Sequence, residues 1–174
     1  INEAYKMVRD SDIRNSQIIS DVESCLTNGR TPLVLTKFKD HAAYLYDNLS
    51  GKVDHIFLLQ GGKSTKERDL IRKQMKEVPE NETIVLVAIG QYIGEGFNYP
   101  RLDTMMLTTP IAWQGNVEQY AGRLHREFEG KQDVIIYDYV DSHIRVLERM
   151  YHKRLRAYKK IGYEICMTLT DKKQ

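Results

Sequence analysis

The feature of this sequence that most constrains its fold is an alternation of short apolar runs with longer segments of helical periodicity. The runs lack the apolar–polar alternation of a strand that has one face in water. They are Leu33–Thr36, His55–Leu59, Thr83–Ile89, Thr104–Thr108 and Val134–Tyr139. Strands of this kind, each followed by a helical segment, predict a parallel sheet covered on both faces. We therefore expect an α/β fold, an open sandwich of helices around a mostly parallel sheet.

Helical segments fill the spaces between the runs. The first covers Asn2–Asn28 and should end at Gly29, which tolerates left-handed geometry. Another surrounds Leu45 and stops at Gly51, and a third spans about Thr65–Glu77. A chain of 174 residues with 41% apolar content can bury one sizeable core. We expect a single domain over residues 1–174, with a helical lead-in at 1–30 and a basic C-terminal helix at about 143–161.

Composition excludes several classes of protein. The 26 basic and 24 acidic residues give a net charge of +2, so a basic surface must come from local clustering. Cys25 and Cys166 lack metal spacing and predict reduced thiols of a cytoplasmic protein. The longest apolar run, Ile84–Ile89, is too short to span a bilayer, and no signal peptide is evident. We expect no membrane association, and the start at Ile1 suggests a piece of a longer protein.

Residues suited to function follow the expected strands. In open α/β sheets, working residues lie on loops that leave the carboxyl ends of the strands. Four stretches of this chain occupy such places: Thr36-Lys37, Gln60-Gly61-Gly62, Gly90–Pro100 and Thr109–Trp113. We therefore expect these four stretches to meet at one edge of the sheet.

The segment after the fourth run carries two arginines and a glutamine around a glycine. Gln119, Gly122, Arg123 and Arg126 are spaced so that one helix would place them on one side. Two guanidinium groups aimed at one place suit a phosphate, although a solvated helix face is the simpler alternative. A glycine inside a helix costs about 1 kcal/mol relative to alanine. We expect Gly122 to be explained by the close approach of a neighbouring backbone.

A second glycine-containing stretch resembles a phosphate-binding loop only in part. Gly62-Lys63-Ser64 follows a strand and precedes a helix, as the end of Gly-x-x-x-x-Gly-Lys-Ser/Thr does. The first glycine of that motif is replaced by Phe57. Ser64 with Glu67 three residues later also forms a capping box, which is the interpretation we prefer. The sequence thus has candidate phosphate-contacting arginines but no phosphate cradle of its own, and no metal site.

Four blocks in order resemble the second RecA-like lobe of superfamily 2 helicases of the DEAD/DEAH type. The segment 33–41 resembles motif four, 59–62 with Glu67-Arg68 resembles the next conserved block, and 86–100 resembles motif five. Gln119, Gly122, Arg123 and Arg126 match motif six, Gln-x-x-Gly-Arg-x-x-Arg. The resemblance covers roughly Arg14 to Val140. It implies a RecA-like three-layer α/β/α sandwich within an ATP-dependent motor.

The resemblance also implies roles for individual residues. Arg126 would be the arginine finger, Arg123 a second contact to the γ-phosphate, and Gln119 a residue that orders the site. Gly122, Gly96 and Asn98 would lie at the nucleotide. The residues expected at the nucleic acid are Thr36, Lys37, Gly61, Ile89, Gly90 and Trp113. ATP with Mg²⁺ would be held mainly by an N-terminal RecA-like lobe of the same parent chain, so the fragment alone is expected to be inactive.

Two positions depart from the common pattern of motif five. Ile89 stands where a threonine usually contacts a phosphate of the bound strand, and Asn98 stands where aspartate is frequent. Asparagine keeps the size and one acceptor oxygen but loses the charge. These changes concern how nucleotide and nucleic acid are coupled.

Several side chains have two interpretations. Trp113 could stack on a base or simply pack in the core. Asp138 and Asp141 are interpreted as turn and cap residues. Residues 145–160 hold seven basic side chains against Glu148 alone, along an apolar stripe that includes Leu147 and Tyr151. This helix suits either a solvated exterior or a phosphate backbone.

Two other classes of function remain open on the sequence. A non-catalytic nucleic-acid adaptor could keep this fold without using ATP. A glycosyltransferase-like α/β domain could place arginines on a diphosphate, although the ordered helicase blocks argue against it. Nucleic acid is the expected partner, with DNA favoured and RNA possible.

Overall fold

The computed structural model describes residues 1–93, 97–110 and 114–168. Its centre is a five-stranded sheet in which every neighbouring pair of strands is parallel. The strands are β1 (Pro32–Thr36), β2 (His55–Leu59), β3 (Ile84–Ile89), β4 (Thr104–Leu107) and β5 (Ile135–Asp138), and their order in the sheet is β2-β3-β1-β4-β5. The predicted strands are confirmed to within one residue at each end.

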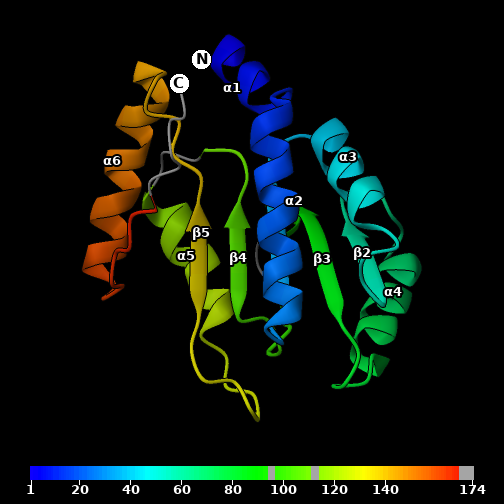
Figure 1. Cartoon of the computed structure of the whole chain (residues 1–174). Coiled ribbons are helices and arrows are strands. Elements are labelled where there is room, and N and C mark those ends of the chain that lie inside the picture. The colour runs from blue at the N-terminus through cyan, green and yellow to red at the C-terminus, as the bar shows by residue number, and fades with distance from the viewer. Residues whose placement is uncertain (94–96, 111–113, 169–174) are drawn as a thin grey trace.

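Helices cover both faces of this sheet (Figure 1). On one face lie α2 (Asp12–Thr27) and α3 (Lys39–Leu49), and on the other lie α4 (Thr65–Glu77), α5 (Gln114–Leu124) and α6 (Arg145–Lys160). The short helix α1 (Asn2–Arg9) packs beside α6, and a 3-10 turn, η1 (Gly90–Ile93), follows β3. The predicted α/β sandwich with helices on both faces of a parallel sheet is confirmed.

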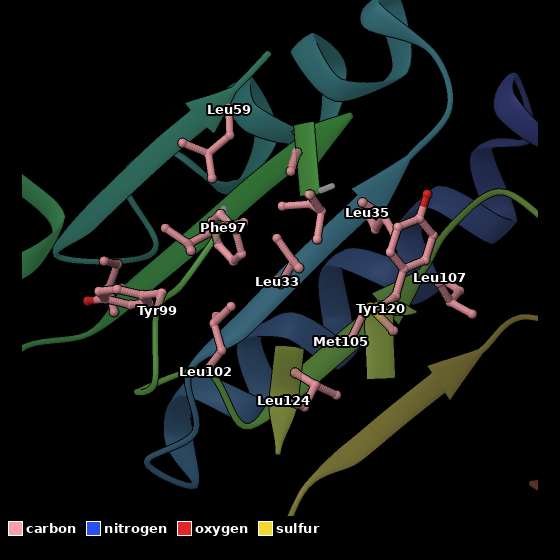
Figure 2. Close-up of a cluster of buried hydrophobic side chains, with 14 of the residues drawn as sticks. Leu33, Leu35, Leu59, Phe97, Tyr99, Leu102, Met105, Leu107, Tyr120 and Leu124 are labelled. Atoms are coloured by element: carbon pink, nitrogen blue, oxygen red, sulfur yellow. The ribbon is translucent and has the colours of Figure 1, made fainter. Parts of the chain in front are cut away.

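The two faces of the sheet are apolar because alternate residues of each strand point to opposite sides. In β1, Leu33 and Leu35 enter the core beneath α4, α5 and α6, whereas Val34 enters the core beneath α2 and α3. Figure 2 shows the first of these cores, where Tyr120 and Leu124 of α5 lie among side chains of β1 and β4. α5 is thus fixed to the sheet by its apolar side.

The N-terminal segment forms two helices rather than the single helix we expected. α1 ends at Arg9, and Ser11 begins α2 by accepting a hydrogen bond from the Arg14 backbone N–H at 3.3 Å. A serine at the N-cap position satisfies one of the free N–H groups of the new helix. The predicted end of α2 is confirmed, since Gly29 follows with a φ of +74°.

Asp141 begins the predicted turn before α6, since its carbonyl accepts from the Ile144 backbone N–H at 3.1 Å, whereas Asp138 is the last residue of β5 and not a turn residue. The side chains of both have a role that we did not predict. Asp138 at the end of β5 accepts two hydrogen bonds from the guanidinium of Arg154, at 2.7 and 2.8 Å. Asp141 binds the guanidinium of Arg14 in the same paired manner, at 3.0 and 3.1 Å. Both pairs are largely buried. They tie α6 and α2 to the carboxyl end of the sheet, where paired guanidinium–carboxylate contacts fix orientation.

Candidate nucleotide and nucleic-acid site

Helix α5 presents an apolar side to the core and a polar side away from it. Val117, Tyr120 and Leu124 are buried, whereas Gln119 is exposed and Arg123 is half-buried. The spacing of the apolar residues is that of one helix face. The glutamine and the first arginine of the predicted site are therefore carried by a helix that the core holds rigidly.

Arg126 does not belong to this helix, which corrects our expectation of four functional residues on one helix. α5 ends at Leu124, and Arg126 lies exposed in the segment that follows. The ammonium of Lys131 binds the carbonyl oxygens of Leu124, Arg126 (2.7 Å) and Pro100 (3.1 Å). Carbonyls at a helix end need new partners, and a lysine there also suits the helix dipole. Lys131 therefore takes up the carbonyls that a continuing helix would have used.

The environment of Lys131 and His125 gives this segment a defined shape. Burial lowers the pKa of the Lys131 ammonium, although the carboxylate of Asp103 acts in the opposite direction. His125 stacks on Tyr163, with Nε2 2.7 Å from the tyrosine hydroxyl. Residues 124–129 and 131–134 line an open hollow beside these contacts. Arg126 thus lies in a segment that is held by two contacts. Lys131 binds its backbone carbonyl, and the preceding residue, His125, stacks on Tyr163.

Gly122 has no neighbour that explains it within the described part of the chain. Apart from its own helix and chain neighbours, no atom there lies within 4 Å of the position a Cβ would occupy. The close approach of a backbone that we expected is absent among the described residues, so for this part of the chain the explanation is wrong. Gly122 instead lies on the exposed surface of α5, beside Gln119 and Arg123.

Gly90, in contrast, is close to a side chain of α5. A Cβ at this position would lie 3.0 Å from the hydroxyl oxygen of Tyr120, and that hydroxyl donates to the Gly90 carbonyl at 3.3 Å. The loop after β3 is therefore attached to the helix that carries Gln119 and Arg123. The same loop is anchored further on by buried Phe97 and Tyr99, whereas Asn98 between them is exposed. Gly96 lies outside the described residues.

Thr36 at the end of β1 belongs to a buried polar network. Its hydroxyl lies 2.8 Å from Nδ1 of His41, and Nε2 of His41 lies 2.8 Å from the side-chain oxygen of Asn15. The Asn15 amide nitrogen donates to the Arg9 carbonyl at 2.9 Å, so its oxygen accepts from His41. His41 therefore carries its proton on Nε2 and accepts the Thr36 hydroxyl proton on Nδ1. Burial, with the nearby charge of Arg14, lowers the pKa of His41 to about 4.

Lys37 is exposed at the carboxyl edge next to this network. Its backbone N–H donates to the Thr109 hydroxyl at 2.8 Å, which joins the loops after β1 and β4. Its ammonium lies 4.3 Å from the centre of the Tyr5 ring in α1, a distance suited to a cation–π contact. The structure therefore brings Lys37 to the surface, whereas it places the hydroxyl of Thr36 in the interior.

The remaining predicted residues lie at the same edge of the sheet or outside the described residues. Gly61, after β2, is exposed, and Ile89 at the end of β3 is half-buried. Trp113 lies outside the described residues. The Ser64 hydroxyl accepts from the Glu67 backbone N–H at 3.2 Å, and Gly62 adopts a φ of +86° in the turn before it. This is the cap we predicted at the start of α4.

Neither a metal centre nor a membrane-spanning helix is found in the described parts of the chain. Among residues 1–93, 97–110 and 114–168, no three His, Cys, Asp or Glu side chains are grouped closely enough to hold a metal ion. None of the helices formed by these residues has the length and apolar character needed to cross a bilayer.

Solved structures with the same arrangement define the class of fold. The structure of UvsW from phage T4 matches 91% of this chain with a TM-score of 0.72 at 16% identity, over 35% of its own length. Domain 2 of the DEAD-box helicase Mss116p, solved bound to an RNA duplex, matches 72% of this chain with a TM-score of 0.57 at 14% identity, over 49% of its own length. The chain therefore shares the RecA-like fold of these two structures.

This chain belongs to the helicase conserved C-terminal domain family, whose model matches residues 16–128. The resemblance to the second lobe of superfamily 2 helicases is thus confirmed. The transcript termination protein A18 of fowlpox virus is 25% identical over 142 residues, which are 80% of this chain. The chain spans only about 30% of the length of that relative.

Proposed function

We propose that this chain is the second motor lobe of an ATP-dependent nucleic-acid helicase or translocase. In the complete protein it would complete an ATP site shared with an N-terminal RecA-like lobe. The observation that carries the proposal is the polar side of α5, where Gln119 and Gly122 are exposed next to Arg123 and no described residue packs against Gly122. A surface of this kind suits a ligand and a second lobe in the complete protein.

The proposed catalytic role falls on the arginines. ATP supplies the reactive phosphoryl group, and its transfer depends mainly on positioning and on neutralising charge that develops at the γ-phosphate. Arg126 is proposed as the arginine finger, Arg123 as a second phosphate contact and Gln119 as an ordering residue. The position of Arg126 beyond the helix suits such a role, because an exposed side chain can reach a neighbouring lobe. Mg²⁺ and the phosphate cradle are assigned to that other lobe.

The carboxyl edge is proposed to contact the nucleic acid. Lys37 is the strongest candidate there, because it is exposed and its backbone is fixed to Thr109. Gly61 and Gly90 would let a phosphate backbone approach the loops after β2 and β3. The Tyr120 hydroxyl joins the Gly90 loop to α5. A movement of this loop on binding nucleic acid could therefore be passed through Tyr120 to the helix that carries Arg123. Closure of the two lobes around ATP, and their opening after hydrolysis, would then move the nucleic-acid contacts of one lobe relative to those of the other.

A nucleic-acid adaptor without catalysis is the second candidate, since the exposed basic residues of α6 could bind nucleic acid without any use of ATP. The two functions differ in the complete protein. A motor lobe should bind nucleic acid with an affinity that changes when ATP or ADP is added, whereas an adaptor should bind equally in all nucleotide states. The same titration with DNA and RNA oligonucleotides would assign the substrate, for which we favour DNA.

The isolated chain offers a direct test of the shared-site proposal. We expect no ATP hydrolysis, with or without single-stranded DNA, because the match of Gly62-Lys63-Ser64 to a phosphate-binding loop is only partial and Ser64 caps α4. A phosphate-release assay measures this. Turnover that disappears in Lys63→Ala would show that this stretch is a functional phosphate-binding loop and that the shared site is wrong.

A further inference from the structure

Helix α6 carries a stripe of basic side chains, here called the α6 stripe, which consists of Arg145, Arg149, Lys153, Arg156 and Lys160. All five are exposed. They are separated by four, four, three and four residues, which places them along one side of a helix. With a rise of 1.5 Å per residue, the stripe is roughly 22 Å long.

The opposite side of α6 is buried against the rest of the lobe. The residues buried there are Leu147, Met150, Tyr151, Arg154, Ala157 and Tyr158. Arg154 is the one basic residue of this side and is neutralised by Asp138. The apolar face is thus occupied by packing within the lobe. A helix in this state cannot insert an apolar face into a membrane, so the stripe can act only through its charge.

The charges of the α6 stripe differ from those of an ordinary solvated helix. On α4, basic and acidic residues are mixed, and Arg72 and Lys73 lie 3.8 and 3.9 Å from Asp69 and Glu77. On α6, Lys160 approaches Glu118 at 3.3 Å, but Arg145, Arg149, Lys153 and Arg156 take part in none of the ion pairs formed by the described residues. These four side chains of the stripe are therefore available to bind an external anion.

The stripe also concentrates the charge of the chain in one place. Seven basic residues and Glu148 give α6 a charge of +6, whereas the whole chain carries +2. The other residues together therefore carry −4. Such a separation attracts a polyanion to one side of the molecule.

Apart from Lys160, whose charge suits the C-terminal end of the helix dipole, the stripe does not stabilise the helix. Arg145 begins α6, where a positive charge opposes the helix dipole at a cost of about 0.3–1 kcal/mol. Like charges four residues apart, such as Arg145 with Arg149 and Arg156 with Lys160, each cost a further few tenths of a kcal/mol. The stability of the helix therefore does not explain the stripe. Such a stripe is expected if its charges serve to bind a ligand.

The stripe begins next to the carboxyl edge of the sheet. Leu147 and Met150, near the start of α6, pack with Tyr5 and Val8 of α1, and Phe38 contacts the same cluster. Phe38 directly follows Lys37, the exposed lysine at that edge. From there α6 runs along the outer side of the sheet beside β5 (Figure 1). A strand leaving Lys37 on this side would meet the stripe.

We infer that the α6 stripe is an extension of the nucleic-acid track, which binds the phosphate backbone of a strand that leaves the carboxyl edge. The inference rests on the proposed function, since that function supplies the strand. At 3.4 Å per phosphate along each strand of a duplex, a stripe of this length spans about six phosphates. The contacts are to phosphates alone, so we expect little dependence on base sequence.

The test compares two charge-reversal variants of the whole chain. Lys153→Glu with Arg156→Glu removes two contacts from the stripe, and Arg72→Glu with Lys73→Glu makes the same change of charge on α4. Binding of fluorescein-labelled oligothymidylate and oligouridylate is measured by anisotropy over a series of salt concentrations. The α6 variant should lose affinity on the order of tenfold or more, and its slope of log K against log salt should fall by about 1.4. The α4 variant should bind like the wild type.

Oligonucleotide length separates an extension from a general attraction. The α6 variant and the wild type should bind alike when the strand is too short to reach α6 and should diverge as it lengthens. Equal loss in the α4 and α6 variants, or no loss in either, would overturn the inference. Binding to phosphatidylserine vesicles but not to oligonucleotides at the same salt would also overturn it.

A further variant keeps this test apart from that of the proposed function. Lys37→Ala should weaken binding of short and long strands alike, because it acts at the edge itself. If Lys37→Ala weakens binding and the α6 variant does not, nucleic acid binds at the carboxyl edge but does not extend along the α6 stripe. That result would support the proposed function and overturn the inference. If the wild type binds no oligonucleotide at low salt, both proposals fail. Thermal unfolding is followed in parallel, and the α6 variant should unfold at or above the wild-type temperature because like-charge repulsion is removed.

Discussion

The imidazole of His41 is a buried base held between the Thr36 hydroxyl and the Asn15 side chain, each at 2.8 Å. Both hydrogen bonds require the neutral ring, because Nδ1 accepts one of them. Protonation in the folded state would leave a charge in the interior, and burial accordingly lowers the pKa to about 4. The end of β1 is therefore built around an uncharged histidine.

This histidine makes stability depend on pH. The unfolded chain takes up the proton near pH 6.5 and the folded chain only near 4, so folding loses stability as the pH falls between these values, by about 3 kcal/mol in all. Between pH 7 and pH 5, the wild type should lose about 2 kcal/mol more than His41→Gln. Urea unfolding of both proteins at the two pH values measures this difference. Equal losses would mean that His41 titrates normally.

Substitution by alanine should change the stability of the chain in opposite directions at Gly122 and at Gly90. Gly122→Ala should stabilise the isolated chain by about 0.5–1 kcal/mol, because the site is exposed and alanine is the better helix former. Gly90→Ala should destabilise it, because the new methyl group meets the Tyr120 hydroxyl at 3.0 Å. Thermal unfolding of both variants provides the comparison. A destabilised Gly122→Ala chain would show that the lobe itself requires the glycine.

Among the structural elements, α6 is attached to the sheet by a charge pair that lies almost entirely out of water. Arg154 is 1% exposed, and Asp138 receives both its guanidinium and the Tyr158 hydroxyl, the latter at 2.6 Å. Burial raises the pKa of Tyr158, so this hydroxyl stays a donor. The stripe on the outer side of α6 thus depends on a network on its inner side.

Replacing one member of this pair should cost far more folding stability than replacing both members together. Arg154→Met leaves the Asp138 carboxylate buried without its main partner and should cost about 3–5 kcal/mol. The double variant Arg154→Met with Asp138→Asn leaves no buried charge and should recover a substantial part of that loss. Denaturant unfolding of the two single variants and the double variant gives the coupling. Strictly additive losses would show that the two side chains do not act as a pair.

The elements show what the sequence could and could not predict. Strands such as Ile84–Ile89 were predictable because they are buried on both faces and read as continuous apolar runs. The break between α1 and α2 was not, because helical periodicity continues across it and only the Ser11 cap ends it. The buried pairs of Asp138 and Asp141 join residues that are distant in the sequence, so no local pattern indicated them. Lys131 was missed for another reason, since a lone lysine in a charged loop looks like a surface residue even though its carbonyl partners Leu124 and Arg126 are close in the sequence.

At the scale of the whole molecule, the parallel order β2-β3-β1-β4-β5 brings the candidate loops to one edge. The sequence predicted that edge because parallel strands share a direction, and the family match confirms the lobe to which it belongs. The sequence did not predict the end of α5 before Arg126, because Gln119 to Arg126 keeps a helical spacing. The carbonyl contacts of Lys131 decide where the helix ends.

The central claim concerns Arg126 in the complete protein, where the partner lobe is present. If Arg126 is the arginine finger, Arg126→Ala should reduce ATP hydrolysis on the order of 10³-fold or more. Arg126→Lys should restore little, because an ammonium lacks the planar fork of the guanidinium. Nucleic-acid affinity without nucleotide should stay close to that of the wild type. Leu124→Ala is the packing control, since this buried side chain can affect turnover only through stability.

Steady-state ATP hydrolysis by the complete wild-type and Arg126→Ala proteins measures this role directly. If Arg126 is the arginine finger, the Arg126→Ala protein should fold, bind nucleic acid and hardly turn over ATP. A folded Arg126→Ala protein that hydrolyses ATP within a few-fold of the wild type would contradict this role.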